Sequence, residues 1–311
     1  MGNIIQIVVH NNPHLDELVA VWLLRNYGEQ KFPEISRAKL VAWGKKDLAR
    51  TPPEMAAMGG ILLVGLGGGM FDDHVDGRRL ECATTLVAKH LEKADCPLLR
   101  RLLRGVFQAD AEADGPLKWL ADRVQGLNRY WCGSMDLEKL YHQVESDIMV
   151  EIERQKEYLA AKDRFAGCYH QRISGIEIAA ADKMDNCQFQ HVARSAGVHI
   201  IVQRNSDGLT QILTGGKVTM DLIDLAVRIR KAEIVKGGLR PRHFLNDKDL
   251  SVNGTVSEIP QWYFEEGMLL NGSESFSDVP PSSIPFRDIV HLVERYVTEA
   301  RRPKVTVETK E

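Results

Sequence analysis

The chain has 311 residues, a formal net charge of −3 and a hydrophobic share of 44%. This length favours two domains over a single core, and the composition is that of an ordinary soluble globular protein. The small net charge argues against a strongly basic nucleic-acid surface. No apolar run reaches the roughly 20 residues that span a bilayer, so we expect no membrane association.

The five cysteines are odd in number, are widely scattered and form no C-x-x-C motif. Zinc-finger and redox-motif interpretations therefore both fail. The N-terminus enters an apolar stretch without the charged region and cleavage site of a signal peptide. We expect reduced thiols and a cytoplasmic protein, the cysteines being Cys82, Cys96, Cys132, Cys168 and Cys187.

In the first half of the chain, apolar β-branched runs alternate with segments of helical periodicity. This alternation predicts a parallel sheet with helices on its faces. The expected strands are 4–9, 37–43 and 61–66, and the expected helices are 15–27, a short one opening at 51–54, 81–94 and 97–108.

Residues 135–163 contain neither proline nor glycine and predict one long exposed helix. Beyond it we expect strands 174–180, 198–203 and 209–213, helix 219–234, a glycine- and proline-bearing segment 237–285, helix 286–301 and a frayed tail. The sequence thus predicts an α/β protein. A parallel-sheet domain (1–134) is followed by a connecting helix (135–165) and a smaller α+β domain (166–311).

Two loops bring together residue types that bind metals. The first expected strand ends in His10, and His14 and Asp16 follow within six residues. Acidic residues here also complement the dipole of the following helix, and a histidine at a strand end is often only a satisfied polar group. Three ligand-type side chains at one strand terminus nevertheless favour a metal site.

The second loop follows the strand predicted at 61–66. A glycine-rich turn, GLGGG, precedes Asp72, Asp73 and His74. The turn is not a dinucleotide-binding fingerprint, because FDDH stands where a helix would have to begin. A solvated acidic loop is the alternative. Since the carboxyl ends of parallel strands meet at one edge, where ligands bind, both loops predict a divalent-metal site that activates water.

These motifs resemble those of the DHH phosphoesterase superfamily. HNNPHLDE is similar to its first motif, FDDH to its D-H-H motif, and Asp110 in ADAEADG to a later aspartate. VGLGG, ECATTLVAKHL and GLNRYW extend the resemblance to the MYG1-type branch over residues 4–131. The sequence departs from the superfamily pattern at three positions. His14 stands in place of an aspartate, Gly65 in place of the bridging aspartate, and Asp73 in place of the first histidine of D-H-H.

The resemblance implies a two-domain metal-dependent phosphoesterase with a manganese-type dinuclear centre. It assigns the metal-ligand role to His10, His14, Asp16, Asp72, His74 and Asp110. Asp73 or His74, whichever does not bind metal, is then the candidate proton acceptor. We expect one or two divalent ions, Mn²⁺ or alternatively Mg²⁺, and a substrate that is a phosphorylated small molecule or a nucleic-acid end.

In the second half, Arg204 and Arg194 are candidates to grip a phosphate, the alternative being ordinary surface arginines. Trp262 and Tyr263 could stack a base or belong to the core, and the basic run 236–242 could follow a nucleic-acid backbone or be a solvated loop. Gly65 leaves open a non-catalytic protein that senses a nucleotide. A hydrolase of another substrate and a homodimer through the long helix also stay open.

Overall fold

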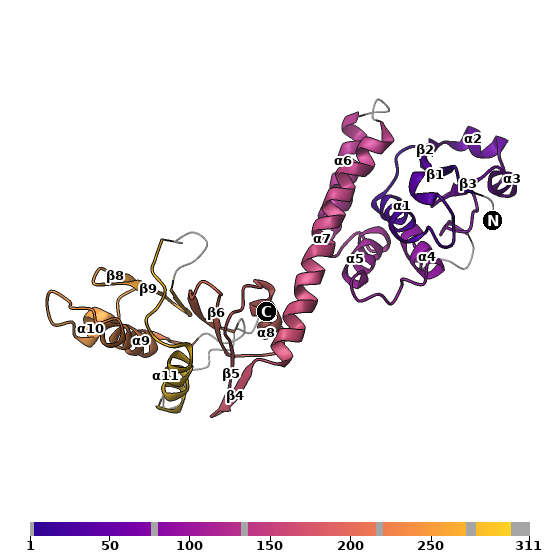
Figure 1. Ribbon diagram of the computed structural model, residues 1–311. Coiled ribbons are helices and arrows are strands. Elements are labelled where there is room, and N and C mark those ends of the chain that lie inside the picture. Colours follow the sequence, from indigo (N-terminus) through magenta and orange to yellow (C-terminus); the bar gives the residue numbers. More distant parts are fainter. Residues whose placement is uncertain (1–2, 76–79, 132–135, 216–219, 272–277, 300–311) are drawn as a thin grey trace. The chain divides into compact units, whose positions relative to one another are not determined.

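The structure is a computed structural model that describes residues 3–75, 80–131, 136–215, 220–271 and 278–299. It divides into two compact units, 1–156 and 157–311 (Figure 1). The first contains a parallel three-stranded sheet and the second a mixed seven-stranded sheet. The predicted two-domain α/β class is therefore confirmed, although the second unit holds the larger sheet. Among the described residues, no helix combines the length and apolarity needed to cross a membrane.

The sheet of the first unit has the strand order β2-β1-β3. Its strands are β1 (Gln6–His10), β2 (Lys39–Trp43) and β3 (Ile61–Leu63). Strand β3 is shorter than predicted, since beyond it only an isolated bridge joins Val64 to Phe71. The chain passes from β1 to one neighbour and then to the other, so the carboxyl edge of β1 is a topological switch point.

Helices cover both faces of this sheet. Alternate residues of β1 bury in different clusters: Ile7 and Val9 pack with α1, whereas Val8 packs with Ala56 of α3 and Leu63 of β3. The helices of this unit are α1 (Leu15–Tyr27), α2 (Lys45–Arg50), α3 (Pro53–Met58), α4 (Ala83–His90), α5 (Arg100–Ala111), α6 (Lys118–Trp131) and α7 (Leu137–Ala166), the last continuing into the second unit. A short 3₁₀ turn, Ile35–Arg37, lies between α1 and β2.

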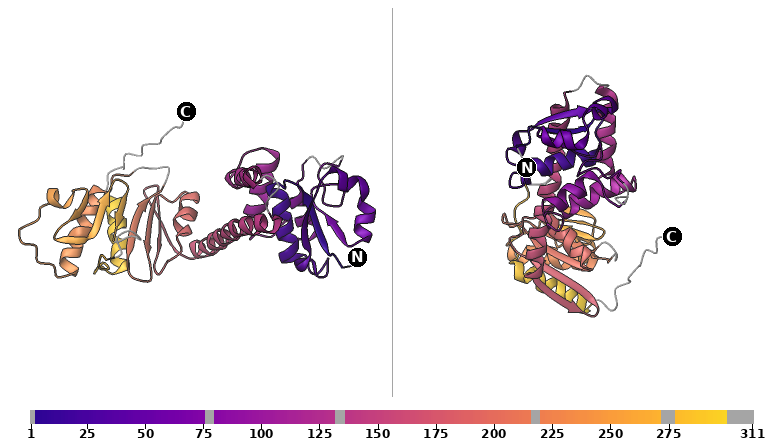
Figure 2. Two further views of the ribbon diagram at one scale, coloured as in Figure 1. Left: turned by 90° about the horizontal axis from the view of Figure 1, so that it is seen from above. Right: turned by 90° about the vertical axis from the view of Figure 1, so that its right-hand side faces the viewer.

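The seven-stranded sheet has the order β4-β5-β6-β7-β10-β9-β8, and only the β5–β6 pair is parallel. Figure 2 shows α11 in yellow alongside its strands. The elements are β4 (Tyr169–Ile173), β5 (Ile176–Ala181), α8 (Gln188–Ser195), β6 (Ile200–Arg204), β7 (Thr210–Thr214), α9 (Ile223–Lys236), α10 (Asp247–Leu250), β8 (Gly254–Val256), β9 (Ile259–Glu265), β10 (Met268–Leu270) and α11 (Phe286–Glu299).

Several of these elements differ from expectation. The segment 237–285, predicted as irregular, contributes α10 and the three strands β8 to β10. Strand β4 was also not predicted, and it is polar and mostly exposed. The beginning of the expected helix 219–234 and the tail 304–311 lie partly or wholly outside the described residues, as does Cys132.

A partly buried ion pair joins α7 to helix α1 of the first unit. The guanidinium of Arg25 donates to both carboxylate oxygens of Glu138, at 3.0 and 2.8 Å, and Glu138 also accepts from the backbone N–H of Leu40. The Arg25 side chain is only 13% exposed. Burial raises the pKa of Glu138, but the hydrogen bonds from Arg25 and Leu40 outweigh it, so that the pKa is lowered on balance.

We therefore expect Glu138→Gln to destabilise the protein by about 1–2 kcal/mol at pH 7. A carboxyl whose pKa is depressed by folding stabilises the native state above its unfolded pKa, and this stabilisation is lost as the pH falls through the folded value. The difference between variant and wild type should thus shrink below about pH 4.5. Urea unfolding at pH 7 and pH 3 measures this difference in the free energy of unfolding. As a control, Glu153→Gln removes an exposed pair with Lys156, and its effect should stay within about 0.5 kcal/mol at both pH values.

Candidate metal centre

The first loop is held together by the side chain of Glu17. One carboxylate oxygen accepts from the backbone N–H of His10 (2.8 Å) and the other from that of His14 (2.8 Å). Glu17 lies in the first turn of α1, where backbone N–H groups lack partners within the helix, and it forms the capping box with His14. From α6, the Asn128 side chain donates to the carbonyl of Pro13 (2.9 Å). The loop from β1 to α1 is thus anchored at three backbone positions.

Glu17 also orients a histidine. Its Oε1 lies 3.0 Å from Nδ1 of His10. This hydrogen bond raises the pKa of His10, although burial lowers it. When Glu17 is ionised, Nδ1 carries the proton and Nε2 is the nitrogen with a free lone pair. A carboxylate behind an imidazole is the arrangement that prepares a histidine to bind metal.

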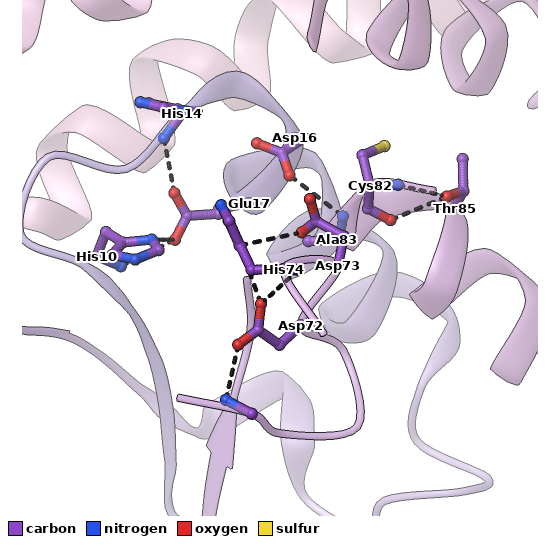
Figure 3. A network of polar contacts seen from close by, with 11 residues as sticks. His10, His14, Asp16, Glu17, Asp72, Asp73, His74, Cys82, Ala83 and Thr85 are labelled. Atoms are coloured by element: carbon purple, nitrogen blue, oxygen red, sulfur yellow. Dashed lines mark hydrogen bonds and ion pairs between the residues drawn. The ribbon is translucent and has the colours of Figure 1, made fainter. Parts of the chain in front are cut away.

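The second loop repeats this pairing with Asp72 and His74 (Figure 3). Asp72 is buried, and its oxygens accept from the backbone N–H of Gly68 (2.7 Å) and of His74 (2.9 Å). Its Oδ1 also lies 3.0 Å from Nδ1 of His74. Burial raises the pKa of Asp72, but these hydrogen bonds lower it on balance. Asp72 therefore acts on the conformation of its own loop and on the ring of His74.

The two loops border one pocket of about 880 Å³ at the carboxyl edge of the three-stranded sheet. It lies entirely within the first unit. The residues of the two loops that line it include Asp73 and His74 but not Asp72. Residues that bear possible metal ligands in this lining are His10, His14, Asp16, Glu17, Asp73, His74 and Asp110.

Carboxylates crowd the pocket. Ligand atoms of His14, Asp16 and Asp110 all lie within 4.8 Å of one another. Asp16 is 5% exposed and accepts from the backbone N–H of Ala83 (3.2 Å). Burial, followed by repulsion from Asp110, raises the pKa of Asp16 well above its usual range. Burial and the negative charge of Asp73 likewise raise the pKa of Asp110.

This donor set fits a divalent cation. Carboxylates held together in a partly dry site repel one another unless a positive charge lies among them. Imidazole and carboxylate ligands together suit a transition-metal ion of the Mn²⁺ type, while the carboxylates alone also suit Mg²⁺. His10 ends strand β1 and His74 lies in the loop after β3, yet the centroids of their rings lie only 6.2 Å apart. The ligand-type residues of both loops thus converge on one place.

The glycine at position 65 is matched by Glu17. Gly65 has φ +72°, and a Cβ built on it would lie 2.8 Å from Cγ of Glu17 and 3.3 Å from its Oε1. The Glu17 side chain therefore occupies the space that a side chain at position 65 would enter. Where the resemblance leads one to expect an aspartate, the fold has a glutamate from the first turn of helix α1.

The two arginines proposed to bind phosphate belong to the second unit and are not among the residues that line the pocket. The guanidinium of Arg204 donates to Oγ1 of Thr210 and to the carbonyl of Ile284, each at 2.8 Å, and these contacts give it a structural role. Arg194 lies exposed in the last turn of α8. Phosphate binding by either residue stays a prediction.

Base stacking by Trp262 is wrong, because its indole is fully buried and donates to Glu233 (2.8 Å). Tyr263 is partly exposed and donates to Glu265 (3.1 Å).

Sequence reasoning did not assign a role to several pocket residues. For Glu17 the sequence indicates only an acid that complements the helix dipole, and its position three residues after the N-cap His14, where a capping-box glutamate stands, is a further signal. Trp43 and Lys45 also line the pocket. The position of Trp43 could have indicated this, because Trp43 ends β2 as His10 ends β1, and the two residues are partners in the register of the strands.

Comparisons with known proteins add no identification. No known protein family matches the chain, and no curated protein matches its sequence. Among solved structures, an uncharacterized protein from Helicobacter pylori G27 is similar at 12% identity and a TM-score of 0.28. The match covers 96% of this chain and 100% of that chain. A similarity of this size supports no conclusion about fold or function.

Proposed function

We propose that the protein is a metal-dependent phosphoesterase that hydrolyses a phosphoester of a nucleotide or a nucleic-acid end. The observation that carries the proposal is the convergence of six ligand-type side chains from two strand ends and helix α5 on one pocket. These are His10, His14, Asp16, Asp73, His74 and Asp110. The unpaired state of the four described cysteines is typical of a reducing compartment, and we infer a cytoplasmic enzyme.

In this proposal His14, Asp16 and Asp110 hold one Mn²⁺ or Mg²⁺ ion, and His10 and His74 are ligands for it or for a second ion. A divalent ion bound there supplies Lewis acidity and lowers the pKa of a water molecule toward neutrality. Glu17 and Asp72 hold the Nδ1 protons of the two histidines, so that each presents Nε2 as a ligand. Asp73, in the pocket wall, accepts the proton of the attacking water.

A second candidate function is nucleotide sensing without catalysis. Position 65 contributes no carboxylate, and Glu17, which fills its space, already accepts three hydrogen bonds from the first loop. A site with fewer bridging ligands binds one ion more readily than two. This candidate predicts bound metal and bound nucleotide without turnover.

The test is metal content of the purified protein together with Mn²⁺-dependent hydrolysis of bis(p-nitrophenyl) phosphate. We expect hydrolysis that requires the ion and falls at least about 100-fold in His74→Gln. His142→Gln, which changes an exposed histidine of α7, is the matched control and should behave as wild type. Hydrolysis that persists without metal, or in His74→Gln, would contradict the proposal. Bound metal without hydrolysis would favour sensing.

A further inference from the structure

One wall of the pocket is unlike the rest. Most of the charged residues in the lining are acidic, and among the residues that the structure describes Lys45 is its one lysine or arginine. Trp43, two residues earlier in the chain, also lines the pocket and is the only tryptophan among its described lining residues. Neither residue belongs to the set that could hold a metal ion, so the proposed reaction leaves both without a role.

The fold fixes Trp43 next to the candidate metal centre. β1 and β2 are parallel, and His10 and Trp43 are Cα partners at their carboxyl ends. Partners in a parallel pair project on the same face of the sheet, and neighbouring strands lie about 4.8 Å apart. Trp43 and His10 therefore project from the same face of the sheet, the one that carries Val8 and Leu63.

Trp43 is anchored as well as exposed to the pocket. It packs against the cluster of Val8, Ala56, Leu63 and Leu66, and it is half-buried. A tryptophan that is fixed on one side and lines a pocket on the other is a ready platform for a planar ring, because stacking needs a large apolar face at small entropic cost. Every nucleobase has such a ring.

Lys45 lies two residues further along the chain, in the first turn of α2, and is exposed. Within the described part of the chain, no carboxylate forms an ion pair with its ammonium group. A lysine at the rim of an acidic pocket attracts an anion that the pocket itself repels. It thereby distinguishes a phosphorylated ligand from an uncharged one.

We propose that Trp43 and Lys45 are the specificity-determining residues of this pocket, Trp43 stacking the base of a nucleotide and Lys45 pairing with its phosphate. The inference rests on the proposed function and deepens it, because it assigns recognition of the base to the first unit. It also stands apart from catalysis, since binding of a nucleotide can be measured where no turnover occurs.

The first experiment is equilibrium binding by calorimetry in the presence of Mn²⁺. Thymidine 5′-monophosphate is expected to bind about tenfold more weakly to Trp43→Leu than to wild type, and Trp43→Phe, which keeps a ring, should recover most of the loss. Trp119→Leu changes a half-exposed tryptophan of α6 outside the pocket and is the matched control. Equal affinity in wild type and Trp43→Leu would overturn the assignment of Trp43.

Lys45 is tested with two ligands. Lys45→Gln should reduce the preference for thymidine 5′-monophosphate over thymidine by about tenfold. Lys46→Gln removes the neighbouring charge, which does not line the pocket, and should leave the preference unchanged. An unchanged preference in Lys45→Gln, or an equal loss in both variants, would refute a specific contact.

Hydrolysis separates this inference from the proposed function. The p-nitrophenyl esters of thymidine 5′-phosphate and of methyl phosphate release the same product but differ in the base. Trp43→Leu should lower the ratio of their kcat/KM values by about tenfold, mainly through KM for the thymidine ester. If wild type hydrolyses neither ester but Trp43→Leu still weakens nucleotide binding, the role of Trp43 in base recognition is supported and the phosphoesterase proposal fails. If both esters are hydrolysed and Trp43→Leu leaves the ratio of their kcat/KM values unchanged, the phosphoesterase proposal is supported and the role of Trp43 in base recognition is refuted.

Discussion

Replacing Asp16 with asparagine is expected to weaken metal binding strongly and, at the same time, to make the metal-free protein more stable. Asp16 is a buried carboxylate of the pocket, 5% exposed, and it lies close to Asp110. Without an ion, its charge is both poorly solvated and repelled. An asparagine removes the charge yet keeps an oxygen that can accept from the N–H of Ala83, so no buried donor loses its partner.

Urea unfolding in EDTA and in Mn²⁺, with parallel metal titrations, measures both effects. We expect Asp16→Asn to bind Mn²⁺ at least about 100-fold more weakly and to gain about 1–3 kcal/mol of stability in EDTA. In saturating Mn²⁺ the wild type should become the more stable of the two proteins, because ligand binding stabilises only the chain that binds the ligand.

Asp114→Asn is the control for general charge removal, since Asp114 is an exposed acid four residues beyond Asp110 that does not line the pocket. It should change neither the metal affinity nor the order of stabilities. A loss of stability in EDTA for Asp16→Asn would mean that the carboxylate is stabilised by the protein itself, and the case for a cation at this position would be lost.

Adding a single methyl group at position 65 is expected to cost about 2–4 kcal/mol. Part of the cost is conformational, because Gly65 has φ +72°, where a residue with a Cβ is disfavoured by about 1–2 kcal/mol. The rest is steric, since the new Cβ would lie 2.8 Å from Cγ of Glu17. Glu17 cannot move aside cheaply, because its carboxylate accepts from the backbones of His10 and His14.

Gly68→Ala separates the two contributions. Gly68 has φ +71°, nearly the same as Gly65, but the nearest atom to its built Cβ is Cγ of Pro53 at 4.0 Å. This variant should therefore lose only the conformational part, about 1–2 kcal/mol. Urea unfolding of both variants, and of Gly65→Ala in a Glu17→Ala background, completes the comparison. If Gly65→Ala costs no more than Gly68→Ala, Glu17 does not fill the space that we assign to it.

The site could be predicted from the sequence to the extent that it depends on where strands end. His10 and His74 follow two apolar runs, and parallel strands align their carboxyl ends whatever their exact pairing. The separate roles of Asp72 and Asp73 could not be predicted in this way. They depend on which carboxylate meets the backbone N–H groups of Gly68 and His74, and adjacent aspartates look alike in a sequence.

The fold was predictable where hydrophobic periodicity is long, as in α1 and α7. It was not predictable in 237–285, where strands of three to seven residues are interrupted by glycine and proline. These strands are stabilised by distant partners, such as β7 for β10, rather than by their own pattern. The position of Trp43 at the pocket could not be predicted for the same reason, because it depends on the register of β1 with β2.

Helix α7 has a consequence for how this protein can be divided. Ile148 and Ile152 belong to the core of the first unit, whereas Ala161, one turn and more beyond the boundary at 156, belongs to a core of the second. The segment that connects the two units is thus a continuous helix and not a loop. A protease that needs an extended segment finds none there until several helical turns have melted. A gene fragment that stops before the helix would leave the first unit with a bare apolar surface, so any excision of that unit has to carry the helix with it.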